Sequence, residues 1–131
     1  MPEVAQVKMK MDTIQNQYEN QLASMNEEIQ KKAQDYQAQE ATMADAVKQI
    51  RQQELQEMQQ RIQLFYQTAE QDIQKKQQEL LAPVHEKMAK AIKAVGERDG
   101  YTYIFDSQAM VHIGADAIDA TPAVKKELGI K

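Results

Sequence analysis

The feature that most constrains the fold is a stripe of apolar residues that recurs every three or four positions near the start of the chain. Steps of three and four place side chains on one face of an α-helix, and here they continue for more than four heptads. The stripe consists of Val4, Val7, Met11, Ile14, Tyr18, Leu22, Met25, Ile29, Ala33 and Tyr36. A single helix would leave this stripe in water, so we expect it to pack against a partner helix.

A second stripe with the same spacing predicts that partner. Its members are Val47, Ile50, Leu55, Met58, Ile62, Phe65, Ala69, Ile73, Leu80, Val84, Met88, Ile92 and Val95. At about 1.5 Å per residue, residues 3–40 and residues 44–82 each span roughly 57 Å, so they match as the two arms of an antiparallel hairpin. Pro83 follows the second arm, and the N–H that proline lacks predicts a kink near residues 79–83.

The turn of this hairpin is expected at residues 40–44, although no Gly or Pro marks it. Thr42 is followed three positions later by Asp45, which resembles the capping box that begins many helices. The alternative is that Thr42 is a polar residue in the middle of a helix. The sequence therefore predicts a helical hairpin over residues 2–82 and a second part over residues 83–131.

The second part has a different pattern, which predicts a small β element. Gly100 suits the left-handed end of the second helix. Residues 101–113 then hold two short runs rich in aromatic and β-branched residues, which is typical of a β-hairpin. A short helix is expected at about residues 121–128, because Asp119 or Thr121 can cap it and a proline follows in its first turn.

The predicted fold class is therefore mainly α with a small β element. A long antiparallel helical hairpin is followed by a short β-hairpin and a C-terminal helix. An isolated two-stranded sheet is marginal in water, and these strands are apolar on both faces. We therefore expect further copies of the chain to cover them, as part of an oligomeric β body.

Composition excludes several classes of function. The chain has no Cys, a net charge of −4 and no block of Lys and Arg, which disfavours thiolate metal sites and nucleic-acid binding. No apolar run approaches the roughly 20 residues of a membrane span. The two histidines, His85 and His112, have no partner at metal-ligand spacing, and Ser107 lacks the context of a catalytic serine. We predict no enzyme, no catalytic residue, no cofactor and no metal.

The segment LLAPVHEKMAKAIKAVGERDGYTYIFDSQAMVHIGADAIDATPAVKKELGI, within residues 79–130, carries a family resemblance. A proline within a helix, a strand entered through GYTYIFD, a second short strand and the run IDATPAVKKELG occur in this order. In this it resembles the Skp (OmpH-like) family of periplasmic chaperones. The resemblance implies a homotrimer in which a small β body carries three helical hairpins. It also implies that these hairpins enclose unfolded outer-membrane proteins in the periplasm without ATP.

Two features depart from the family pattern. Family members carry a signal peptide and a first β-strand ahead of the first helix, whereas this sequence starts at that helix with Met1-Pro2-Glu3. The resemblance implies a body of three strands, and two of them are expected within this sequence. Well-known members are basic and this chain is acidic, so charge attraction to acidic clients or lipopolysaccharide is not predicted.

The resemblance also implies which residues serve assembly and which contact clients. The family's body strands fall on Tyr103–Asp106 and Val111–Ile113, so the assembly residues are Tyr103, Ile104, Phe105, Val111, Ile113 and Ile118. A holdase needs dispersed, adaptable apolar side chains, and Met is flexible and polarisable. Three residues off the stripe or near the turn are the client-contact candidates: Met9, Met43 and Tyr66. For Met11, Met25 and Met58, which lie on the stripes, we expect packing between the helices instead.

Two other interpretations compete with this one. A prefoldin-like chaperone also places helical arms on a β body, but its strands lie between the two helices, whereas here they follow both. A structural coiled-coil scaffold without client binding is the second alternative. Its apolar stripe would have to continue into a specific partner helix.

Overall fold

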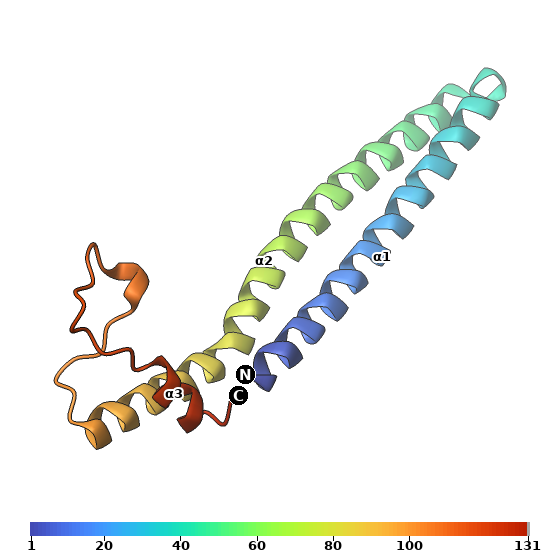
Figure 1. Cartoon of the computed structure of the whole chain (residues 1–131). Coiled ribbons are helices and arrows are strands. Elements are labelled where there is room, and N and C mark those ends of the chain that lie inside the picture. The colour runs from blue at the N-terminus through green and yellow to red at the C-terminus, as the bar shows by residue number, and fades with distance from the viewer. Residues whose placement is uncertain (131) are drawn as a thin grey trace. The chain divides into compact units, whose positions relative to one another are not determined.

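The computed structural model describes residues 1–130, and these residues form a long helical hairpin followed by a loop and a short helix (Figure 1). The elements in chain order are α1 (Pro2–Gln39), the 3-10 turn η1 (Glu40–Thr42), α2 (Asp45–Asp99), the 3-10 turn η2 (Ser107–Ala109) and α3 (Thr121–Glu127). The predicted helical hairpin and the predicted short C-terminal helix are confirmed. The chain forms two compact units, a hairpin unit (Lys8–Gln77) and a terminal unit (Met1–Val7 with the chain from Gln78 onward).

In the hairpin unit, α1 and α2 lie side by side along their apolar stripes (Figure 1). The α1 stripe residues from Met11 to Tyr36 are half-buried, whereas the polar residues between them are exposed. On α2 the matching residues are half-buried, and Ala69 is buried. Because a long helix gains most of its stability from packing an apolar face, each arm holds the other in helical form.

The first two members of the α2 stripe do not take part in this packing. Val47 and Ile50 are exposed. The reason is the register of the hairpin, in which Tyr36 of α1 is hydrogen-bonded to Gln52 of α2. Residues of α2 that precede Gln52 lie opposite the end of α1 at Gln39, where little helix remains to cover them.

The turn is held by hydrogen bonds to the carbonyl groups of Gln39 and Glu40, rather than by a side-chain cap on α2. The Thr42 hydroxyl donates to the carbonyl of Gln39 at 3.1 Å, and the Met43 N–H donates to the carbonyl of Glu40 at 3.3 Å. The predicted capping box at Thr42 is therefore wrong. The last carbonyls of a helix lack intrahelical partners, and Thr42 supplies one of them with a donor.

Helix α2 continues through Pro83 and ends at Asp99. A proline inside a helix costs about 3 kcal/mol or more, because it removes a hydrogen bond and crowds the preceding turn. Val84, which follows directly, and Val95 are both buried, so tertiary packing holds this part of the helix. Gly100 then takes a left-handed φ of 75°, and the Tyr101 N–H donates to the Gly96 carbonyl at 2.9 Å. This is the Schellman form of helix ending.

The predicted β-hairpin over residues 101–113 is wrong, because no strand is present among residues 1–130. The position expected for its turn holds η2, in which the Asp106 carboxylate accepts from the Gln108 N–H at 2.9 Å. Two-residue β-hairpins close instead through turns with positive φ, for which this stretch has no glycine. With no third strand beside it, a two-stranded ribbon gains too little to form.

The core of the terminal unit lies on one face of α2. Val84, Ala91 and Val95 are its buried residues, and Val95 has no exposed surface. Ile104 of the following loop is half-buried next to Gly96, where an added Cβ would meet the Ile104 Cδ1 at 3.5 Å. The loop therefore starts by packing back onto the helix that it has just left.

Two polar contacts tie other elements of this unit to α2. Lys87 forms an ion pair with Glu3 at the start of α1, and this pairing lowers the pKa of the Glu3 carboxyl. Arg98 donates to the carboxylate of Glu127 in α3 at 3.0 Å. Just before α3, the Asp119 carboxylate accepts from the Thr121 N–H at 2.9 Å. The N-cap position itself is Ala120, which makes no side-chain cap bond, so neither Asp119 nor Thr121 is the N-cap residue.

Candidate functional site

A polar link crosses the apolar seam of the hairpin unit towards the end that lies away from the turn. The Tyr18 hydroxyl donates to the Asp72 carboxylate at 2.5 Å. The Tyr18 ring also lies 5.8 Å, between centroids, from the tilted ring of Phe65. The bond to Asp72 raises the pKa of Tyr18, and burial and the charge of the carboxylate act in the same direction. This link fixes the register of the two arms at a point where apolar residues alone would allow them to slide.

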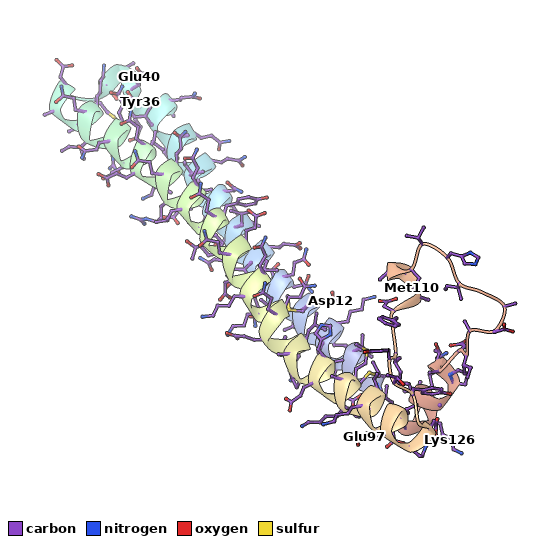
Figure 2. All side chains as sticks on the ribbon, turned by 90° about the vertical axis from the view of Figure 1, so that its left-hand side faces the viewer. Asp12, Tyr36, Glu40, Glu97, Met110 and Lys126 are labelled. Carbon is purple, nitrogen blue, oxygen red and sulfur yellow. The ribbon has the colours of Figure 1, made fainter. Side chains whose placement is uncertain are left out.

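A pocket of about 230 Å³ lies at the turn end of the hairpin unit, and we call it the tip pocket. Its lining residues are Lys32, Asp35, Tyr36, Gln39, Met43, Arg51, Glu54 and Leu55. The Tyr36 hydroxyl accepts from the Gln52 amide at 2.8 Å, which orients its ring beside the pocket. Figure 2 shows Tyr36 together with Glu40 at this end of the hairpin.

A second, shallower hollow of about 540 Å³ lies along the arms and opens widely to solvent. It is lined by Leu22, Asn26, Ile62, Gln63, Tyr66 and Gln67. Tyr66 is 59% exposed, so its ring forms an accessible edge of this hollow. The mixture of apolar and amide groups suits weak contact with a polypeptide better than retention of a small molecule.

The three client-contact candidates lie at different places on the hairpin unit. Met9 is 70% exposed on α1, and Tyr66 borders the shallow hollow of α2. Met43 is half-buried and contributes to the tip pocket instead of pointing freely into solvent. The structure does not bring these three residues into one site.

Two apolar residues of α2 that are more than half exposed were not among the predicted contact residues. Leu64 is more than half exposed and belongs to neither stripe, which is the signal that could have identified it. Ile50 is also more than half exposed, but it falls on the stripe spacing. Only the position of the turn shows that Ile50 lacks a partner. Exposed apolar groups are therefore scattered along α2 and do not form one continuous patch.

The loop between α2 and α3 presents most of the predicted assembly residues to solvent. These exposed side chains are Tyr103, Phe105, Val111, Ile113 and Ile118. The rings of Tyr103 and Phe105 stack at 5.8 Å, as expected for residues two apart in extended backbone. Ile104, the sixth predicted residue, is half-buried and faces α2 at Gly96. Figure 2 shows Met110 on the same loop.

No catalytic arrangement emerges around the two histidines. His85 lies on α2 and His112 on the loop, and both are exposed. Within residues 1–130, no cluster of three or more His, Cys, Asp or Glu side chains is placed to hold a metal ion. In the same part of the chain, no helix has the length and apolar character needed to cross a membrane.

Comparison with known proteins gives one match. A protein-family model described as "OmpH: Outer membrane protein (OmpH-like)" matches residues 1–128, which is nearly the whole chain. No curated protein and no solved structure matches this sequence.

Proposed function

This chain belongs to the OmpH-like family, whose members are periplasmic chaperones without enzymatic activity, and we propose that it is an ATP-independent holdase for unfolded outer-membrane proteins. In this proposal the hairpin unit contacts clients and the terminal unit assembles copies of the chain. The function is to keep clients soluble in the periplasm until they reach the outer membrane.

The observation that carries the proposal is the scatter of exposed apolar side chains on the hairpin unit. Met9, Leu64 and Tyr66 are each more than half exposed. Met9 lies between two lysines of α1, whereas Leu64 and Tyr66 are two residues apart on α2, a spacing at which side chains do not face each other. Single apolar contacts of this kind are weak, but several of them acting on one client chain add up through avidity. Their separation also limits association between copies through large apolar patches.

The loop between α2 and α3 is the proposed assembly surface, and a homotrimer is the proposed assembly. Val111 is fully exposed at 106%, and Tyr103, Phe105, Ile113 and Ile118 are also exposed. Exposed apolar residues that follow one another along a loop mark an interaction site. Ile104 anchors this loop on α2 and leaves its neighbours free to contact another copy.

The seam argues against the scaffold alternative. A scaffold needs an apolar stripe that is free for a partner helix, but α1 and α2 pack most of their stripe residues in the hairpin unit against each other within one chain. What remains exposed on the hairpin unit is dispersed, which suits variable clients better than one specific partner.

An aggregation assay tests the holdase proposal. An outer-membrane protein diluted from urea is followed by light scattering, with and without the full chain and with no ATP present. We expect the chain to lower the scattering at a several-fold excess. The triple variant Met9→Gln, Leu64→Gln and Tyr66→Gln is expected to lose much of this effect. Its matched control is Met25→Leu, which keeps a half-buried seam position apolar. No suppression by the unmodified chain would refute the proposal.

Multi-angle light scattering tests the assembly proposal separately. A mass that rises with concentration towards three chains is expected for the unmodified protein. Substitution of Val111 and Ile118 by Ser is expected to keep the protein monomeric, because both residues lie at the exposed loop surface. An unmodified chain that stays monomeric at every concentration would contradict the assembly proposal and leave the aggregation assay unaffected.

A further inference from the structure

We propose that the tip pocket takes a single aromatic side chain from an extended client segment. The inference rests on the holdase function proposed above and assigns one specific site to it. The tip pocket is more enclosed than the shallow hollow along the arms, and it is built from α1, the turn and α2 together.

The size of the pocket suits one ring. Its volume is about 230 Å³. An apolar cavity of about 150 Å³ in another protein is known to hold benzene, so there is room here for one aromatic side chain but not for a folded segment. An extended client could therefore insert a side chain while its backbone stays outside.

The apolar wall of the pocket consists of groups that pack well on aromatic rings. Met43 brings a thioether, and sulfur makes favourable contacts with ring edges at about 5 Å. Tyr36 offers its own ring, which the hydrogen bond from Gln52 holds in place. Leu55 completes the wall from α2. Two of these three groups favour an aromatic guest over an aliphatic one of similar size.

The charges around the pocket also favour a neutral aromatic guest. Lys32 and Arg51 are balanced by Asp35 and Glu54, so the lining carries no net formal charge. Arg51 and Glu54 are already paired at 3.2 Å, and a charged guest would compete with this pair. A neutral ring leaves the pair intact and offers its face to the guanidinium of Arg51, which adds a cation–π attraction.

The chemistry of the proposed clients meets this requirement. Strands of transmembrane β-barrels carry girdles of aromatic residues at both membrane interfaces. In the unfolded client an extended polypeptide carries these aromatic side chains, and polar and small residues separate them. One ring held at the tip would anchor the client, while the dispersed contacts along the arms hold the rest.

Methionine-methyl NMR on the full chain tests the inference. The probes are N-acetyl-phenylalanine amide and, as its aliphatic match, N-acetyl-leucine amide. We expect the phenylalanine compound to shift the Met43 methyl signal upfield in a saturable way, because a bound ring shields protons over its face. The Met25 signal is expected to stay in place, since Met25 is half-buried in the seam outside the pocket. Parallel shifts of both signals, or no shift of Met43, would overturn the inference.

Variants sharpen the test. Arg51→Gln is expected to weaken binding of the phenylalanine compound about two- to fivefold, through loss of the cation–π contact. Arg61→Gln, an exposed arginine of α2 outside the pocket, is the matched control and is expected to bind normally. Equal affinity for the leucine compound would show an aliphatic pocket and overturn the aromatic assignment.

The outcomes separate the site from the function. A chain that suppresses aggregation but shows no Met43 response refutes the tip pocket alone. A chain that fails to suppress aggregation refutes the proposed function, whatever the NMR titration gives.

Discussion

Substitution of Val95 by Ala tests the packing of the terminal unit most directly. Val95 lies on α2 and is fully buried, at 0% exposure. The change removes two methyl groups, each worth about 0.8 kcal/mol of burial, and leaves a small cavity that adds to the loss. Ala is the better helix former by roughly 0.5 kcal/mol, which offsets part of it. We expect a net loss of about 1.5–2 kcal/mol in the free energy of unfolding.

The matched control is the same substitution at Val47, which lies on the same helix and is 42% exposed. Here the gain in helix propensity and the small loss of burial nearly cancel, so we expect a change within about 0.5 kcal/mol. Urea unfolding followed by circular dichroism gives the free energies. Hydrogen exchange of the amides near Val95 shows whether the loss is local to the terminal unit. Equal effects of the two substitutions would refute the burial argument.

Further substitutions test individual contacts. Gly96→Ala is expected to stabilise the protein by up to about 1 kcal/mol in urea unfolding, because Gly96 is helical and an added Cβ has ordinary contact distance there. Gly100→Ala is expected to cost about 1 kcal/mol, because its φ is +75°; a stabilised Gly100 variant would contradict this. The pKa of Glu3 is lowered from 4.5, so its contribution to stability is present above pH 4.5 and is lost as pH falls through the folded pKa. The urea midpoints of the wild type and Glu3→Gln should therefore differ at pH 7 and converge as the pH falls below the folded pKa of Glu3. The pKa of Tyr18 is raised from 10.0, so its contribution is present below pH 10 and is lost as pH rises through the folded pKa. Ultraviolet titration should show that Asp72→Asn lowers the pKa of Tyr18, and an unchanged titration curve would contradict the assigned cause.

The helical hairpin could be predicted because its signal is long and repeated. Every residue of the α1 stripe from Met11 to Tyr36 is half-buried, as the period of three and four residues requires. The start of the second stripe could not be predicted in the same way. Ile50 has the right spacing, but the spacing does not show that α1 has ended on the other side of the seam.

The error at residues 101–113 has a different cause. Alternating aromatic and β-branched residues report a preference for extended backbone, and the stacked rings of Tyr103 and Phe105 agree with that local preference. A sheet also needs neighbouring strands, which a local pattern does not supply. The hydrogen bond between Tyr18 and Asp72 could not be predicted from the sequence either. It joins residues on separate helices, and no local pattern fixes the register of those helices.

The two hydrogen bonds that Tyr18 and Tyr36 make across the seam limit how the hairpin unit can change in length. Tyr18 is hydrogen-bonded to Asp72, and Tyr36 is hydrogen-bonded to Gln52. The two arms therefore have nearly equal numbers of residues between these two hydrogen bonds. A deletion in one arm alone would break one link and turn apolar residues of the remaining stripe out of the seam. Paired deletions of seven residues, one in each arm between the links, would keep both links and the face of each stripe. The hairpin unit can therefore change length only in steps of one heptad taken in both arms at once.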